Sequence, residues 1–296
     1  MRRASETYKA FFLALALIQV VSSAYLSSPN LKAQTDTKWF SLKEVSEKVW
    51  QIRSFGNNKY LIEGRDSSLL IDTGLGVADL ASLVKKLTCK PLIVVNTHGH
   101  PDHAGANYQF EKVYMHAADT SIARQYNLPE WRAEMSKDML QRNMISESDL
   151  FKGKPFNTKI IPVSEGYIFD LGDRRIQVME TPGHTLGSIC LLDIENRLLF
   201  SGDNNDVMVS LFLKECTPLH VYLETLEKQK ARISEFNILL PGHGKPIQSD
   251  IINDQIECVK GILNGTCQST ESKTFVGNSM KCKFGRVSVV YNPENL

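Results

Sequence analysis

The chain lacks three features that would each have decided its class. It has almost no net charge, with 34 basic against 33 acidic residues. Proteins that bind nucleic acid normally carry a basic face, so we expect no nucleic-acid partner. No Gly-x-Ser-x-Gly sequence occurs, which excludes the serine-centred elbow of many esterases. No uncharged apolar run reaches the roughly 18–20 residues of a comfortable transmembrane helix.

The N-terminal residues have the layout of a secretory signal. Arg2, Arg3 and Lys9 precede an apolar stretch from about Ala10 to Val21, and small residues follow to Ala24. This pattern predicts a signal peptide over residues 1–24, cleaved after Ala24, and a secreted or periplasmic protein with no stable membrane partner. An uncleaved signal anchor is the alternative. Cleavage would remove three basic residues and one acidic residue, leaving a formal charge of −1.

Histidine is scarce, yet it is concentrated in one place. Among seven histidines, His98, His100 and His103 lie within six positions of one another, beside Asp102. They follow the apolar segment PLIVVN (91–96), which is typical of a buried strand. The four side chains therefore leave the end of a core strand and enter a loop punctuated by glycine and proline. Imidazole nitrogens with a carboxylate suit zinc best, although iron and manganese accept such a set.

Further candidate ligands follow other short apolar runs beside a glycine. His184 comes after a run near 175–180, Asp203 after LLFSG, and His243 after FNILLPG. Together with the cluster at 98–103 they provide five histidines and two aspartates, enough for two adjacent metal ions. His116 and His220 remain, and for both we favour a structural role.

These motifs resemble those of the metallo-β-lactamase-fold hydrolase superfamily. The chain contains His-x-His-x-Asp-His at 98–103, Gly-His-Thr at 183–185, Ser-Gly-Asp at 201–203 and Pro-Gly-His at 241–243. An Ile-Asp-Thr-Gly segment (71–74) matches the strand-end aspartate of the family, here Asp72, which supports the ligands from behind. The resemblance covers about residues 40–250.

The resemblance implies a metal site with an assigned ligand set. His98, His100 and His184 would hold one divalent ion, with Zn²⁺ as the expected metal. Asp102, His103 and His243 would hold a second, and Asp203 would bridge the two.

Two such ions lower the pKa of a bridging water from ~15.7 toward 7, which provides hydroxide at neutral pH. Asp102 is placed to orient this hydroxide and take its proton. The sequence therefore predicts a secreted dinuclear-metal hydrolase that acts on a small-molecule carboxylic ester, lactone, thioester or amide.

The residue at the bridging position, Asp203, indicates which branch of the superfamily the chain resembles. The β-lactamases proper have cysteine or histidine there, whereas Asp203 points toward the glyoxalase II, lactonase and esterase branch. Asp206 stands where the lactonases have a tyrosine, and the sequence after Asp203 lacks the basic, glycine-rich stretch of glyoxalase II. Two alternatives stay open: β-lactam hydrolysis, and a persulfide dioxygenase with a single iron.

The family resemblance implies an α/β fold, an αββα sandwich of two facing mixed β-sheets with helices outside. After the signal peptide we expect a linker (25–39), the main domain (40–250) and an extension (251–296) packed on the same domain. Residues 117–150 are helical in spacing, and Trp131, Met135, Met139 and Leu140 either roof the site or bury this insertion. The expected strands are 47–53, 59–63, 68–72, 91–96, 158–162, 166–170, 174–180, 188–193, 198–201 and 236–240, with helices at 77–88, 103–110, 217–233 and 249–263 and a final strand or hairpin ending in FGRVSVVYN.

Six cysteines are compatible with an oxidising compartment. Cys190 lies in an apolar run and is expected to be a buried thiol, and Cys89 is read in the same way. A Cys267–Cys282 bridge would staple the C-terminal segment.

The metal hypothesis gives a first prediction. His100→Ala removes a ligand of the first ion and should abolish hydrolysis while the protein stays folded. Metal analysis, followed by assays on β-lactams, lactones, thioesters and phosphodiesters, would measure the effect, and unchanged turnover in the variant would refute the metal mechanism.

Overall fold

The computed structural model describes residues 35, 36 and 38–296, which form two compact units. The N-terminal unit ends at Ile176 and the C-terminal unit comprises Gln177–Leu296. The expected signal peptide (1–24) and most of the expected linker lie outside the described residues. Among the described residues, no helix combines the length and the apolar character needed to cross a membrane.

The N-terminal unit is built on a mixed eight-stranded sheet whose strands follow one another in chain order. Neighbouring strands are antiparallel from β1 to β5 and parallel from β5 to β8. The strands are β1 (Thr35–Asp36), β2 (Ser41–Ser46), β3 (Val49–Ser54), β4 (Asn57–Glu63), β5 (Ser68–Ile71), β6 (Leu92–Val95), β7 (Lys112–His116) and β8 (Lys159–Val163).

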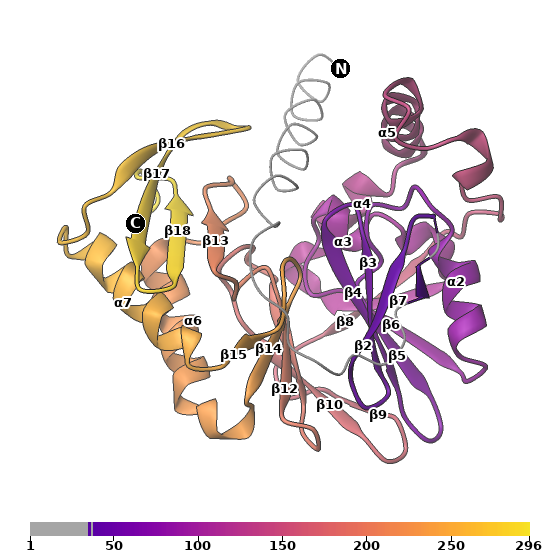
Figure 1. Cartoon of the computed structure of the whole chain (residues 1–296), viewed down its shortest axis with the longest axis horizontal. Helices are drawn as coiled ribbons and strands as arrows, with labels where there is room; N and C mark the ends of the chain where they lie inside the picture. The colour runs from indigo at the N-terminus through magenta and orange to yellow at the C-terminus, as the bar shows by residue number, and fades with distance from the viewer. Residues whose placement is uncertain (1–34, 37) are drawn as a thin grey trace. The chain divides into compact units, whose positions relative to one another are not determined.

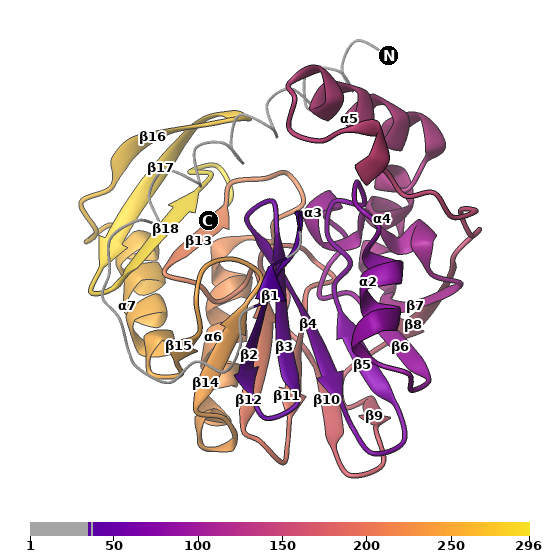
Figure 2. The same ribbon diagram turned by 45° about the vertical axis from the view of Figure 1, so that its right-hand side comes forward.

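Helix α2 (Leu80–Leu87) covers part of this sheet (Figure 2). Its buried residues Leu80, Leu83 and Val84 share one apolar cluster with residues of β3 to β7. The helix begins later than the predicted residue 77 because Asp79 caps it: the carboxylate accepts hydrogen bonds from the Ser82 N–H at 2.9 Å and the Ser82 hydroxyl at 2.7 Å. The other elements of the unit are α3 (Pro101–Ala104), α4 (Thr120–Tyr126), α5 (Pro129–Gln141), the short 3₁₀ helices Asn107–Gln109, Ala117–Asp119 and Glu147–Asp149, and β9 (Ile168–Asp170).

The C-terminal unit contains two sheets. In the first, the strands run in the order β15-β14-β12-β11-β10, and β12 and β14 are parallel. In the second, the order is β13-β18-β17-β16, with β13 parallel to β18. The strands are β10 (Arg175–Glu180), in which the unit begins, β11 (Ile189–Asp193), β12 (Leu198–Gly202), β13 (Met208–Leu211), β14 (Ile238–Pro241), β15 (Ile247–Gln248), β16 (Thr270–Thr274), β17 (Gly277–Phe284) and β18 (Val287–Tyr291).

Two helices, α6 (Leu219–Ala231) and α7 (Ile251–Leu263), lie side by side in this unit (Figure 1). Helix α7 also contacts β17 and β18, and one apolar cluster joins both helices to both sheets. The Cys267–Cys282 disulfide expected from the sequence is present and ties the segment after α7 to β17. Cys190 is buried as predicted, whereas Cys89 is exposed.

Several predicted elements differ from the structure. The helix expected at 103–110 is wrong: α3 starts earlier, at Pro101, because proline is favoured in the first helical position, and a separate 3₁₀ helix follows at 107–109. Strands β2 and β16 were not expected because they are mostly polar, and β13 was not expected because it is only four residues long. In α5, Met135 and Met139 are buried, so these two methionines pack into their unit.

Candidate metal centre

The parallel strands β5 and β6 deliver the N-terminal unit's candidate ligands at their carboxyl ends. Ile71 pairs with Val95, so Asp72, the residue after β5, lies beside the start of the loop that follows β6. That loop carries His98 and His100, and α3 carries Asp102 and His103. All four side chains are at most 10% exposed. The predicted cluster is therefore assembled within one unit and shielded from water.

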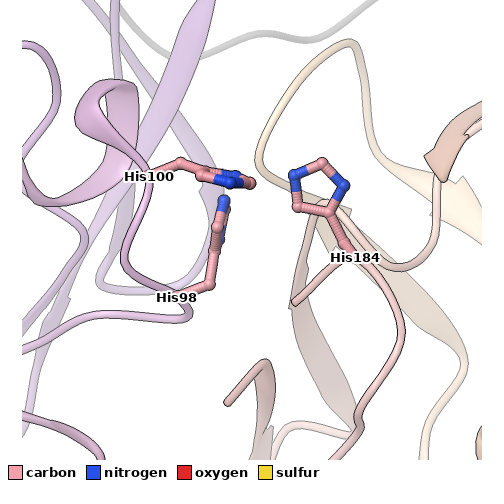
Figure 3. A group of neighbouring side chains, drawn as sticks. All are labelled: His98, His100 and His184. Carbon is pink, nitrogen blue, oxygen red and sulfur yellow. The ribbon is translucent and has the colours of Figure 1, made fainter. Parts of the chain in front are cut away.

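Neighbouring side chains of this cluster lie close enough to bind a common metal ion. The rings of His98 and His100 are 4.9 Å apart and perpendicular, and those of His98 and His103 are 4.2 Å apart. A ligand atom of His98 lies within 4.8 Å of one of His100 and of one of His103. Figure 3 shows the edge-on arrangement of His98 and His100 on the loop after β6, and labels His184, which comes from the loop after β10.

Gly99 lets the loop after β6 pass close to the backbone of Asp119. A Cβ atom at this position would lie 2.7 Å from the carbonyl oxygen of Asp119. The Gly99 N–H donates instead to the Asp119 carboxylate at 2.7 Å. The loop is therefore anchored between the two histidines by a buried carboxylate.

Asp72 organises the histidines of this unit. Its carboxylate accepts hydrogen bonds from the Thr97 N–H at 2.8 Å, the Thr97 hydroxyl at 2.9 Å and His103 Nδ1 at 2.8 Å. Since a carboxylate only accepts, His103 carries its proton on Nδ1, and Nε2 keeps the lone pair that a metal ion needs.

The tautomer of His98 is fixed in the same way, through the hydroxyl of Thr97. The Thr97 hydroxyl gives its proton to Asp72, so its oxygen accepts from His98 Nδ1, 3.1 Å away. Nε2 of His98 therefore also carries the lone pair. One buried carboxylate thus sets the tautomers of two imidazoles, one directly and one by relay.

The C-terminal unit places its three candidate ligands at other strand ends. Asp203 follows β12 and His243 follows β14, and these strands are parallel neighbours in which Gly202 pairs with Pro241. The Asp203 carboxylate lies 3.3 Å from His243 Nε2 and 3.6 Å from His184 Nε2. The rule that ligands follow apolar runs beside glycine therefore brings all three together.

His184 is held by the backbone around it. Its N–H donates to the Asn204 side-chain oxygen at 2.9 Å, and its Nδ1 lies 2.7 Å from the carbonyl oxygen of Ser210 in β13. A carbonyl oxygen only accepts, so the proton of His184 is on Nδ1 and the lone pair is on Nε2. Gly183 is required beside it, because a Cβ there would lie 2.5 Å from the Tyr222 ring.

Each unit therefore contains a histidine lone pair that faces a carboxylate oxygen. His184 Nε2 faces Asp203 at 3.6 Å, and His103 Nε2 faces Asp102 at 3.6 Å. Two buried acceptors repel each other unless a cation or a proton lies between them. Nitrogen and carboxylate donors are also the set that zinc and similar ions prefer. The residues present fit divalent metal ions.

Lys59 is a residue near this centre that the sequence did not reveal. It lies in β4 and is completely buried, and its Nζ donates to the Ser54 hydroxyl at 2.5 Å and to the Asn57 side-chain oxygen at 2.6 Å. Burial lowers the pKa of Lys59 to about 7, although the charges of Asp72 and Asp102 oppose this shift. Nothing in the strand sequence NNKYLIE indicates that its lysine is buried beside the candidate ligands.

Asp206 is a second carboxyl group near the ligands of the C-terminal unit. Burial raises its pKa to about 7, the Asp203 charge adds to this, and the Val207 N–H and the His243 charge oppose it. A Cβ at Gly244, the residue after His243, would lie 3.3 Å from both oxygens of Asp206. The residue that departs from the lactonase pattern therefore adds an acid beside His243.

The two histidines assigned structural roles lie elsewhere. His116 ends β7, and its Nδ1 accepts from the Ala118 N–H at 3.3 Å. His220 lies in α6, with Nδ1 3.1 Å from the Leu296 carbonyl oxygen. Neither belongs to a ligand cluster in the part of the chain that the structure describes.

Comparison with known proteins identifies the family. Residues 53–227, more than half of the chain, match the metallo-beta-lactamase superfamily. The chain belongs to the metallo-β-lactamase superfamily. This superfamily consists of metal-dependent hydrolases, so the class expected from the sequence is confirmed at that level. The mixed sheets with their helices are those of the α/β metallo-β-lactamase fold.

Two relatives and one solved structure illustrate the likeness. Acyl-coenzyme A thioesterase MBLAC2 of Bos taurus is 32% identical over an alignment of 189 residues that covers 56% of this chain and 66% of the relative. Atrochrysone carboxyl ACP thioesterase AacuM of Aspergillus aculeatus is 24% identical over 210 residues, 70% of this chain and 56% of the relative. A metallo-beta-lactamase from Pontibacter korlensis superposes with a TM-score of 0.55 and 16% identity, covering 75% of this chain and 99% of that one. The first relative is thus matched over just under two thirds of its length.

The hydrogen-bond relay through Thr97 can be tested by metal binding. Thr97→Val keeps the size of the side chain but removes the hydroxyl, which frees His98 to adopt the other tautomer. Loss of such a supporting hydrogen bond typically lowers metal affinity by about 10–100-fold. Zinc competition with a chromophoric chelator measures the change, and Thr97→Ser, which keeps the hydroxyl, should bind as the unchanged protein does. Equal affinity in the valine variant would contradict the relay.

The buried charge of Lys59 predicts a pH-dependent stability of the metal-free protein. Below pH 7 the ammonium is charged in the folded and unfolded chains alike, and its burial lowers the free energy of unfolding by a constant amount. Between about 7 and the unfolded value of 10.5 it is neutral only when folded, so the free energy of unfolding rises with pH, by up to roughly 1.4 kcal/mol per unit.

Lys59→Met should lose this rise when unfolding by urea is measured from pH 6 to 10 in the presence of a chelator. Lys86→Met, which changes an exposed lysine of α2, is the matched control and should keep it. A parallel pH dependence in all three proteins would show that Lys59 is not a neutral group in the folded chain.

Proposed function

We propose that this protein is an exported dinuclear-metal hydrolase whose preferred substrate is a thioester. In this proposal His98, His100 and His184 hold one ion, Asp102, His103 and His243 hold the other, and Asp203 bridges them. The observation that supports it best is the lone pair facing a carboxylate at 3.6 Å in each unit, because both pairs call for a cation. The names of the two relatives, both thioesterases, favour the thioester among the carbonyl substrates.

The residues of the chain have distinct tasks in this reaction. When bound, divalent ions acidify a coordinated water and polarise the carbonyl oxygen of the substrate. The Asp102 carboxylate takes the proton of the attacking water, a general-base role. Asp72 and the Ser210 carbonyl keep three imidazoles in the tautomer that ligation requires. The low exposure of His98, His100 and His103 keeps competing water away from the ligand atoms.

A thioester suits this arrangement because its leaving group is a thiolate. The sulfur departs as an anion of low basicity, so no side chain has to protonate it when the C–S bond breaks. An amide or an alkyl ester would need such an acid. Thioester hydrolysis therefore needs an attacking water, a base that takes its proton and a polarised carbonyl, but no general acid for the leaving group.

Export is supported by two independent features. The apolar stretch from about Ala10 to Val21 follows a basic start, as in secretory signals. The Cys267–Cys282 bridge is of the kind that persists in oxidising compartments.

The proposal predicts metal-dependent release of a thiol. Acetyl- and butyryl-coenzyme A should be hydrolysed with a higher kcat/KM than the matched oxygen esters, a lactone or a β-lactam, as measured with a thiol-reactive chromophore and by proton release. A chelator should abolish turnover and Zn²⁺ should restore it. Asp102→Asn should lower kcat by about 10²-fold or more, and His116→Ala should leave it unchanged.

The substrate panel also discriminates between the alternatives. A preference for the β-lactam would make the protein a β-lactamase. Oxygen uptake with a persulfide, together with one bound iron, would make it a dioxygenase. Thioester turnover that survives chelation would contradict the metal mechanism altogether.

A further inference from the structure

Strand β13 presents an apolar face to the outside of its sheet. Val209 and Leu211 are buried in the core of the C-terminal unit, so the alternate residues Met208 and Ser210 point to the opposite face. Phe212 follows on the same side, and its ring contacts that of Phe275 edge-on, with 5.5 Å between centroids. Phe275 lies in the turn between β16 and β17, next to Val276, which is 51% exposed.

This face begins at a candidate metal ligand. β13 forms the edge of its sheet, with β18 as its neighbour (Figure 1). The Leu211 carbonyl oxygen accepts from the Asn292 N–H in the chain after β18, whereas the carbonyl of the preceding residue, Ser210, accepts from His184 Nδ1 at the open edge. Two residues beyond His184, Leu186 is 63% exposed. We call Leu186, Met208, Phe212, Phe275 and Val276 the β13 face.

The register of the sheet makes the apolar strip narrow. Met208 pairs with Ser288, which pairs with Lys283, and Ser210 pairs with Val290, which pairs with Lys281. Directly paired residues lie on the same side of a sheet, so this side carries a serine and a valine in β18 and two lysines in β17. A strip bounded by charge on one side and by a metal ligand at its edge fits a single extended chain better than a broad partner surface.

We propose that the β13 face binds the acyl chain of the substrate and makes the enzyme selective for long acyl groups. The inference rests on the proposed function, because it takes the carbonyl carbon to be attacked beside His184. From there an acyl chain can run along Met208 toward Phe212 and Phe275, which offer methylene-compatible contacts and no charge. Each methylene that leaves water on binding strengthens binding roughly fourfold.

The experiment compares chain-length selectivity in four proteins. They are the unchanged full-length chain, Met208→Ser, the double variant Met208→Ser with Phe212→Ser, and Phe284→Ser. Phe284 is 45% exposed at the turn between β17 and β18 and is the matched control for loss of an exposed aromatic ring. Thermal unfolding is measured for each protein, so that a folding defect is seen directly.

The first readout is kcat/KM on coenzyme A thioesters from acetyl to hexadecanoyl. The unchanged chain and Phe284→Ser should prefer dodecanoyl over acetyl by at least tenfold. The double variant should lose most of this preference, measured as the ratio of dodecanoyl to acetyl kcat/KM, and Met208→Ser should be intermediate. An equal ratio of long to short substrates in the double variant and the unchanged chain would overturn the inference.

The second readout does not depend on turnover. Binding of cis-parinarate, a fluorescent fatty acid, is titrated in the presence of a chelator, and the double variant should bind at least tenfold more weakly than Phe284→Ser. If no thioester is hydrolysed but this difference in binding is found, the proposed function fails and the acyl site stands. If thioesters are hydrolysed without chain-length preference and parinarate binding is unchanged, the acyl site fails and the proposed function stands. Loss of binding to phosphatidylcholine vesicles in the double variant, with unchanged chain-length selectivity, would assign the face to a lipid surface and overturn the acyl site.

Discussion

The carboxylate of Asp72 is the constraint on which the candidate centre of the N-terminal unit depends. It accepts three hydrogen bonds, two of them from Thr97 and one from His103. Its backbone lies in the left-handed region, with φ of 63°, a conformation that aspartate tolerates better than most residues. The turn after β5 therefore favours a residue such as aspartate, asparagine or glycine, and the hydrogen bonds from Thr97 and His103 favour a carboxylate among these. Lys59 is buried next to this network, and the charge of Asp72 favours the protonated form of its amine against the effect of burial.

In the C-terminal unit, a backbone carbonyl instead of a carboxylate fixes the tautomer of the histidine. The Ser210 carbonyl fixes His184, and the Asn204 side chain holds the N–H of the same residue. The amide group of Asn204 also bonds the Thr181 carbonyl oxygen, so the loop that carries Asp203 is tied to the loop that carries His184. The two units thus prepare their ligands independently, and each reaches an arrangement in which a lone pair and a carboxylate oppose each other until a cation joins them.

The sequence pointed to the candidate ligands because each of them obeys a local rule. A metal ligand at a strand end needs an apolar run before it and a glycine beside it, and both are visible in the chain at His184, Asp203 and His243. The supporting residues follow no such rule. Thr97 is a common residue whose importance comes from Asp72, which is 25 positions away. Lys59 has a lowered pKa only because β4 packs inside its unit and buries the side chain. The helix misplaced at 103–110 shows the same limit, since Pro101 fixed its start more strongly than the apolar spacing suggested.

The segment after α7 supports a strand that holds one of the candidate ligands. The family match ends at residue 227, so β16, β17 and β18 lie beyond it, whereas β13 lies within it. Yet β13 takes its place in a sheet through β18, and Phe212 packs on Phe275 from the turn between β16 and β17. The Cys267–Cys282 bridge in turn fixes β17 to the segment after α7. The C-terminal segment therefore supports β13, whose Ser210 carbonyl oxygen accepts from His184, although the segment itself contains none of the candidate ligands.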